Sequence, residues 1–291
     1  LQINPEFKIE LINQESTPAR YLFLPHEEKI VEVSEQNSNN KYDIAFCLDG
    51  GAERTGDVQP LFSASATRVL VDHHRWTEEL PYEIDLSNPD AAATGEIVFD
   101  LLQTAERGKL TKSIATNIYL ALIFDTGFFR FSLTTPKTHK DAAELIATGI
   151  DFSEIAELGI LRVSLSAKRL LGAAMTAIEL HDENRIAGVT ISAKMREDTD
   201  AKDDDHERVI QHLMQIESVK VAFLLYELPE GGTKISFRSD GTLDVGGFAK
   251  EFTGGGGHSR AAGCSFSEGS TAALYDKVAT ALGAALGNVT A

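Results

Sequence analysis

Three short, largely apolar runs, each followed at once by an aspartate, constrain the fold of this chain more than any other feature. They are Ile44–Leu48 before Asp49, Thr67–Val71 before Asp72, and Ala121–Phe124 before Asp125. Such runs, bounded directly by turn residues, are typical of strands buried in a parallel sheet. Ligands of open α/β sheets bind outside the carboxyl ends of the strands. We therefore expect the three aspartates to share one edge of a sheet.

Two histidines, His73 and His74, directly follow Asp72 and add imidazole groups to this edge. Carboxylates and imidazoles together suit a divalent ion such as manganese, zinc or iron. A simpler interpretation exists for each residue, because a strand-end aspartate can cap a turn and adjacent histidines occur in surface loops. The repetition of the pattern at three strand ends favours a metal site.

The whole chain is predicted to be an α/β protein with two domains. Residues 1–135 alternate between strand and helix, which indicates a mostly parallel, doubly wound sheet with helices on both faces. Two of these helices are expected to begin at Thr94 and at Thr111, the second ending at Leu120 before the Asp125 strand. A hairpin around Pro229–Gly232 belongs to a smaller α/β domain with a mixed sheet. The expected boundaries are 1–160 for the first domain, 161–183 for a helical linker and 184–291 for the second domain.

Composition excludes several classes of protein. The 291 residues are 43% apolar and 24% charged, as in soluble globular proteins, and no apolar run approaches the length of a membrane span. The formal net charge of −17 argues against binding of long nucleic acid, because such binding needs many basic side chains in contact with phosphates. Cys47 and Cys264 lie far apart in apolar surroundings and predict two reduced, buried thiols in a cytoplasmic protein.

At this point the motifs resemble a known family. Asp49, the triplet Asp72–His74 and Asp125 are similar to the second, third and fourth motifs of the DHH phosphoesterase superfamily. Far downstream, Gly254–Gly263 (GGGGHSRAAG) resembles the signature of the substrate-binding domain that accompanies many DHH enzymes. The triplet alone is moderately specific, whereas the combination is strong and extends over nearly the whole chain.

The resemblance implies a metal-dependent phosphoesterase of the bifunctional oligoribonuclease and 3′-phosphoadenosine 5′-phosphate phosphatase (nanoRNase) group. Residues 1–160 would form its metal-binding catalytic domain and residues 184–291 its substrate-binding domain, with the active site between them. The implied cofactor is Mn²⁺. The implied substrates are short RNA, linear or cyclic dinucleotides, or a nucleoside bisphosphate. Long duplex nucleic acid and membranes are not expected partners, and a homodimer is common among similar proteins.

The resemblance also implies roles for individual residues in the first domain. The expected metal ligands are Asp49, as the bridge between two ions, together with His73 and Asp125. His74 is expected to contact the phosphate or donate a proton, and Asp72 to orient a histidine. Arg130 either reaches the substrate or pairs with an acidic neighbour.

In the second domain the resemblance implies a site for the substrate phosphate. Its expected residues are Arg238, Ser239, Gly255, Gly256, Gly257 and His258. Arg238 can grip a phosphate through its planar guanidinium, although an ordinary surface salt bridge is the simpler interpretation. The glycines can form an anion-binding nest of backbone amides or simply a flexible loop.

One family motif is missing from the sequence. The first motif, His-x-x-x-Pro-Asp-x-Asp-Ala, should precede Asp49. Residues 1–43 contain a single histidine, His26, and no Asp-x-Asp follows it. We expect the first strand and its motif to be lost by truncation or through an incomplete gene, and one of two metal sites to be incomplete. The alternative is therefore a non-catalytic nucleotide-binding protein or an inactive fragment. A manganese-dependent pyrophosphatase and an exonuclease on long single-stranded DNA fit the motifs and the acidity less well.

Overall fold

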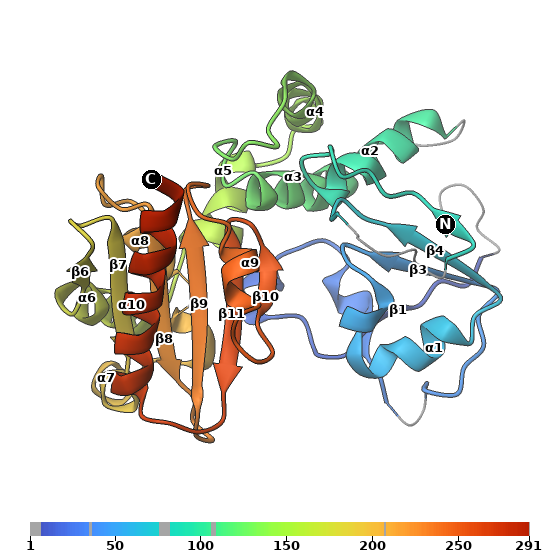
Figure 1. Cartoon of the computed structure of the whole chain (residues 1–291). Coiled ribbons are helices and arrows are strands. Elements are labelled where there is room, and N and C mark those ends of the chain that lie inside the picture. Colours follow the sequence, from blue (N-terminus) through green and yellow to red (C-terminus); the bar gives the residue numbers. More distant parts are fainter. Residues whose placement is uncertain (1–6, 35–36, 76–81, 106–108, 207, 291) are drawn as a thin grey trace. The chain divides into compact units, whose positions relative to one another are not determined.

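The computed structural model describes residues 7–34, 37–75, 82–105, 109–206 and 208–290, with side chains except at positions 53, 203, 204 and 288–290. The chain divides into two compact units, Leu1–Arg162 and Val163–Ala291, each with its own apolar core (Figure 1). Within the described residues, no helix combines the length and the hydropathy that crossing a membrane requires.

The described residues of the first unit form two parallel sheets and five α-helices. Its strands are β1 (Leu11–Asn13), β2 (Ile30–Glu32), β3 (Ile44–Leu48), β4 (Thr67–Val71) and β5 (Ile84–Asp85). Its α-helices are α1 (Gln59–Ser63), α2 (Thr94–Thr104), α3 (Lys112–Asp125), α4 (Pro136–Ala147) and α5 (Phe152–Ala156). Strands β3, β4 and β5 form one sheet in that order, and β1 pairs with β2 in the other.

Strand β4 is covered on both faces, as the sequence predicts for a buried parallel strand. Val69 and Val71 pack with Ile97 of α2, whereas the intervening Leu70 packs with Phe62 of α1. Successive side chains of a strand point to opposite faces, so α1 and α2 lie on opposite faces of the sheet. This arrangement confirms the expected α/β class with helices on both faces of a parallel sheet.

The predicted strand Ala121–Phe124 is wrong, because these residues form the last turn of helix α3. Thr111 accepts a hydrogen bond from the backbone N of Ile114 and caps this helix, which then continues past Leu120 to Asp125. Helix α3 is apolar on most sides and lies in the core, where Leu122 and Ile123 are fully buried. A short apolar run inside such a helix has no periodicity that separates it from a buried strand.

The second unit is a six-stranded mixed sheet with helices on both faces. Its strands are β6 (Glu179–His181), β7 (Ile186–Ile191), β8 (Val221–Glu227), β9 (Thr233–Ser239), β10 (Gly256–His258) and β11 (Ala261–Phe266). Its α-helices are α6 (Leu165–Thr176), α7 (Ala193–Thr199), α8 (Val209–Leu213), α9 (Val245–Ala249) and α10 (Thr271–Thr290). The strand order is β10-β11-β9-β8-β7-β6, and only the β7–β8 pair is parallel among the described strands.

Strand β8 separates the two cores of this unit. Val221, Phe223 and Leu225 pack toward α9 and α10, whereas Leu224 and Tyr226 pack toward α6 and α8. Figure 1 shows α10 running along the strands on its face of the sheet. The hairpin of β8 and β9 confirms the turn predicted around Pro229–Gly232.

Segment 161–183, predicted as a helical linker, contains helix α6 and strand β6. Ser164 caps α6 by accepting a hydrogen bond from the backbone N of Ala167. Leu170 and Ala174 of this helix are fully buried in the core beside β7 and β8. Helix α6 is therefore part of the second unit's core.

The remaining elements are short and single-turn. They are the 3₁₀ helices η1 (Ala19–Tyr21), η2 (Glu27–Lys29), η3 (Ala52–Arg54), η4 (Gly56–Val58) and η6 (Asp203–His206), and the π-helical turn η5 (Glu157–Leu161).

Candidate metal centre and substrate-binding residues

Asp72 at the end of β4 is fully buried and organises the two histidines after it. One of its carboxylate oxygens, Oδ1, accepts hydrogen bonds from the backbone N of His73 (2.7 Å) and of His74 (3.1 Å). The same oxygen lies 2.7 Å from the His74 side-chain Nδ1. Asp72 thus fixes the orientation of the His74 ring and leaves Nε2 as the nitrogen that can meet a ligand.

Asp49 directly follows β3 and has a left-handed backbone, with φ of +62°. This conformation is uncommon for residues other than glycine and collects at functional sites. Its carboxylate Oδ1 accepts a hydrogen bond of 2.8 Å from the hydroxyl of Thr94, the first residue of α2. The sequence indicated Thr94 only as a helix start, so this contact, 45 residues away along the chain, was missed.

His73 lies between Asp49 and Asp125. Its Nε2 atom is 3.7 Å from Asp49 Oδ1 and 3.8 Å from Asp125 Oδ2. Two ligands that each lie about 2.1 Å from one ion are at most about 4.2 Å apart, and both separations meet this limit. The structure thus brings together the three residues that the sequence predicted as metal ligands, although Asp125 reaches the group from a helix end.

The electrostatics of this group favour a cation. Burial, together with the negative charge of Asp49, raises the pKa of Asp125 to about 6. Neighbouring His73 and His74 oppose this rise. A carboxylate held near a second carboxylate with little water is unfavourable, and a bound cation relieves that cost.

His74 belongs to the same group of donors. The sequence analysis expected this histidine to contact the phosphate or donate a proton. Asp49, His73 and His74 each offer an atom within 4.8 Å of the others. Asp125 is not a member of this three-residue group but lies 3.8 Å from His73 Nε2, and imidazole and carboxylate donors of this kind fit a divalent ion. His26, the histidine nearest the absent first motif, pairs instead with Glu28 at 3.8 Å.

Arg130 lies in a turn that follows α3. Its exposed side chain donates from Nε to the carbonyl of Gly127 (2.6 Å) and stacks over Phe131. Gly127, Phe128 and Phe129 are all left-handed, with φ of 54°, 60° and 62°. The substrate role expected for Arg130 stays a prediction.

In the second unit, strand register places Arg238 and His258 on one face of the sheet. Ala261 on β11 pairs with Arg238 on β9 and with His258 on β10. Residues directly opposite each other across strands point to the same face, so the three side chains share a face. Two strand spacings separate Arg238 from His258, about 10 Å.

Arg238 is available to an anion. Burial lowers the pKa of its guanidinium, whose Nη1 donates to the carbonyl of Phe237 (2.9 Å). Among the described side chains, no carboxylate lies within ion-pair distance of it. A partly buried guanidinium without a carboxylate partner favours binding of an anionic ligand.

Ser239 is placed differently from Arg238. Its hydroxyl is buried and accepts hydrogen bonds from the backbone N of Gly241 (3.0 Å) and of Leu243 (3.3 Å). It points to the face opposite that of Arg238, because neighbouring strand residues alternate. The Ser239 hydroxyl therefore stabilises the turn at residues 241–243. Its role in substrate binding stays a prediction.

Packing explains two of the three glycines predicted to bind phosphate. A side chain at Gly255 would collide with the carbonyl of Ala249 in α9, and one at Gly257 would meet the carbonyl of Ala261 at 2.6 Å. Gly257 also has a φ of +138°. A side chain at Gly256 would meet nothing within 4 Å, so this position faces open space.

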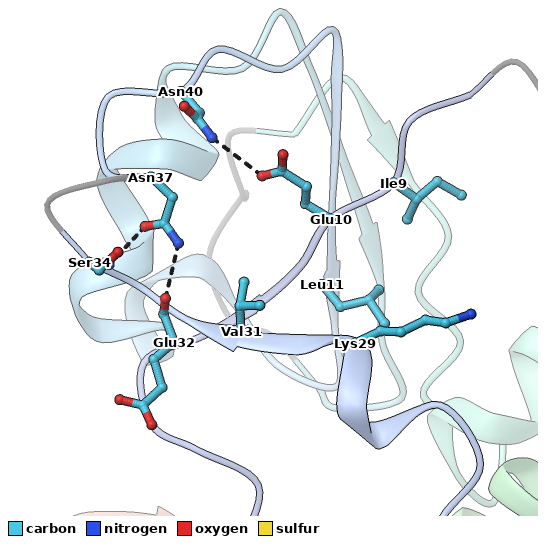
Figure 2. A pocket seen from close by; sticks show the side chains of 9 residues that line it. All are labelled: Ile9, Glu10, Leu11, Lys29, Val31, Glu32, Ser34, Asn37 and Asn40. Atoms are coloured by element: carbon cyan, nitrogen blue, oxygen red, sulfur yellow. Dashed lines mark hydrogen bonds between the residues drawn. The ribbon is translucent and has the colours of Figure 1, made fainter.

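A hollow of about 430 Å³ beside β1 and β2 is a weaker candidate for a site (Figure 2). Asn37 there accepts from the backbone N of Ser34 (2.8 Å) and donates to the carbonyl of Glu32 (3.0 Å). Asn40 donates to Glu10 at 3.4 Å. These side chains bond to nearby backbone groups and, for Asn40, to Glu10, and this geometry points to turn formation.

Two family models match the chain, one in each unit. Residues 6–122 match the DHH family, N-terminal domain, and residues 185–285 match the DHHA1 domain. The matched regions contain the Asp49 and His73 group and the Arg238 and His258 group respectively.

Two curated relatives that share one name are similar to this chain over most of its length. The "Bifunctional oligoribonuclease and PAP phosphatase NrnA" of Thermus thermophilus is 29% identical over 276 residues, covering 91% of this chain and 78% of its own length. The protein of the same name from Bacillus subtilis is 28% identical, covering 76% of this chain and 69% of its own length.

A solved structure shares the fold. The crystal structure of an exopolyphosphatase-related protein from Bacteroides fragilis superimposes with a TM-score of 0.88 at 24% identity, covering 97% of this chain and 84% of that one. The family models, the relatives and the motif residues agree. The chain therefore belongs to the DHH family of phosphoesterases, with a DHH domain followed by a DHHA1 domain.

Proposed function

We propose that this chain hydrolyses phosphate esters of short oligoribonucleotides and of 3′-phosphoadenosine 5′-phosphate, with Mn²⁺ as cofactor. The observation that carries the proposal is the convergence of His73 Nε2 on Asp49 and Asp125, at 3.7 and 3.8 Å. The names of the relatives from Thermus thermophilus and Bacillus subtilis support the substrate class.

Asp49, His73 and Asp125 would hold the metal ion, with His74 beside them. A divalent ion supplies a deprotonated water at neutral pH and offsets charge on the phosphoryl oxygens. Thr94 keeps the Asp49 carboxylate turned toward His73 through its hydrogen bond.

His74 is proposed to serve the phosphoryl group or the leaving oxygen. Asp72 accepts from its Nδ1, which places a proton on that nitrogen and leaves Nε2 facing the ligand. The Nε2 atom then either contacts the phosphate or donates a proton to the leaving alkoxide.

Arg238 and His258 are proposed to bind a phosphate of the same substrate. Both point to one face of the second unit's sheet, and Gly256 allows close approach of a ligand to the backbone there. A few placed cations suit a small phosphorylated substrate in a chain with a net charge of −17.

The test is turnover of four compounds with Mn²⁺: 5′-phosphorylated diadenylate, 3′-phosphoadenosine 5′-phosphate, inorganic pyrophosphate and a long single-stranded DNA. We expect hydrolysis of the first two, lost on chelation by EDTA and in Asp49→Ala. Hydrolysis of pyrophosphate alone would overturn the substrate class. Binding of the nucleotides without any turnover would favour a non-catalytic nucleotide-binding protein.

A further inference from the structure

A groove of about 570 Å³ in the second unit extends from Arg238 along strand β9. Helix α8 packs on β8 and β9 and forms its other side. The volume lies within the range of small-ligand sites. Of the groove's lining, the resemblance assigned a role only to Arg238.

The β9 side of the groove is cationic. Lys234, Ser236 and Arg238 alternate along the strand and so point to the same face. Among described side chains, Lys234 also has no carboxylate within ion-pair distance. The two cations are four residue steps apart along the strand, about 13 Å, which equals the rise of three to four stacked nucleotides.

His206 and helix α8 line the other side of the groove with an imidazole and an amide. His206 stacks on Tyr226 with ring centroids 4.0 Å apart and 21° between the planes. Tyr226 itself is buried on β8, paired with Lys234 in the strand register. Arg196 lies over the Tyr226 ring at 5.0 Å, so Tyr226 supports the His206 ring. Gln211 of α8 adds an amide that can donate and accept hydrogen bonds. Glu230, the acidic residue of the lining, stands in the exposed hairpin turn.

A single nucleic-acid strand has the same two-sided character. Its phosphates face one side and its bases the other, and proteins bind it with cations along the backbone and rings against the bases. We propose that this groove binds the nucleotides of an oligoribonucleotide that lie beyond the phosphate held by Arg238, with Lys234 as a second phosphate contact and the partly buried His206 ring as a stacking surface. This inference rests on the proposed function for the choice of ligand, and it predicts a dependence of affinity on substrate length.

The experiment measures the affinity of fluorescently labelled diadenylate and pentaadenylate by anisotropy in EDTA, where no hydrolysis is needed. We expect the intact chain to bind the pentamer about tenfold more tightly than the dimer. Lys234→Met and His206→Ala should each reduce this length preference by about threefold to tenfold. Lys194→Met is the matched control, because this lysine of the same unit pairs with Asp198 outside the groove and should leave the preference intact.

Equal affinity for dimer and pentamer would overturn the proposal, as would a length preference that both groove variants retain. Lys234 is exposed, so its substitution keeps the test valid if His206→Ala fails to fold. Turnover of diadenylate with Mn²⁺, measured separately, reports on the proposed function. Length-dependent binding without turnover would contradict the proposed function but would still support the groove proposal.

Discussion

Thr94 shows how one hydroxyl can set the geometry of a carboxylate that we propose as a metal ligand. Asp49 is half exposed and follows a strand in a left-handed conformation, so little packing fixes its side chain. The bond from Thr94, which is itself buried, supplies the missing restraint. We infer that Thr94 is a positioning residue for the metal centre.

Thr94→Val should weaken Mn²⁺ binding by roughly tenfold, because a hydrogen bond to a charged group contributes about 1.5 kcal/mol. Thr94→Ser retains the hydroxyl and should restore most of the affinity. Calorimetric titration measures both constants, and thermal unfolding of the metal-free variants separates this effect from simple destabilisation. Equal metal affinity in Thr94→Val and the unchanged chain would contradict the positioning role.

The partly buried carboxylate of Asp125 makes the stability of the metal-free protein depend on pH. Without metal, burial beside Asp49 raises its pKa to about 6, whereas an unfolded aspartate titrates near 3.9. The folded state therefore binds more protons between these values, and stability falls as the pH rises from about 4 to about 6. Above that range the carboxylate is charged in both states and the full cost remains.

Asp125→Asn removes this cost, so it should raise the free energy of unfolding of the metal-free protein at pH 7.5 by about 1–2 kcal/mol. At pH 4 the same substitution should have little effect. Urea unfolding at both pH values, with the metal chelated, measures the difference. A loss of stability of equal size at pH 4 and pH 7.5 would show that Asp125 acts through packing alone.

Some residues of the candidate site could be predicted from the sequence, and others could not. Sequence reasoning grouped Asp49, His73 and Asp125, because Asp49, Asp72 and Asp125 directly follow apolar runs and His73 comes next after Asp72. The structure places His73 near the other two. Sequence reasoning could not find Thr94, because a contact 45 residues apart leaves no local pattern. It also had no means to separate Gly256 from Gly255 and Gly257, since close packing against α9 and β11 is a tertiary property.

Helix α3 is the element where local pattern and tertiary context disagree. Ala121–Phe124 followed by Asp125 has the composition of a strand end, yet it continues a helix that the core surrounds. The aspartate nevertheless lies 3.8 Å from His73 Nε2, because α3 packs closely on α2. A side chain at Gly95 of α2 would meet Cβ of Ala121 at 2.8 Å. Short strands such as β5 and β10 were missed for a related reason, since two or three residues carry no measurable periodicity.

Helix α4 is tied to α2 by a charged network around Lys137. Its ammonium lies 2.5 Å from Asp141, 2.8 Å from Asp100 and 3.4 Å from the buried Glu96. Burial opposes the charge on Lys137, but hydrogen bonds to Asp100 and Asp141 raise the pKa of the amine above its usual range. The network thus holds the helix whose first residue, Thr94, contacts Asp49.

Lys137→Met leaves buried Glu96 and Asp141 without their cation and should destabilise the protein by about 1–3 kcal/mol. The estimate is at the low end for buried pairs because Lys137 is half exposed. Lys137→Arg is the matched control and should retain most of the stability. The midpoint of urea unfolding measures the effect, and an unchanged midpoint in Lys137→Met would show that the network contributes nothing to stability.

At the scale of the whole molecule, the two units have separate cores and separate parts of the proposed chemistry. The predicted metal ligands lie between residues 49 and 125, whereas Arg238 and His258 belong to the second unit. A ligand stabilises the part of a protein that must be folded to bind it.

We therefore expect calorimetry to resolve two unfolding transitions. Mn²⁺ should raise the Tm of only one of them, that of the first unit. At a concentration of one hundred times the dissociation constant, the stabilisation should be about 2.7 kcal/mol, several degrees in Tm for a unit of this size. Asp49→Asn should abolish the shift. Equal shifts of both transitions would contradict independent units.

The measurement that tests the central claim most directly is calorimetric titration of the chain with Mn²⁺. The account predicts saturable binding that His73→Ala and Asp49→Asn each weaken at least tenfold. Asp90→Asn is the control, because this exposed carboxylate lies 18 residues beyond Asp72 and pairs with Arg75 at 3.2 Å. Absence of binding, or equal binding by the unchanged chain and both ligand variants, would contradict a metal centre at this position.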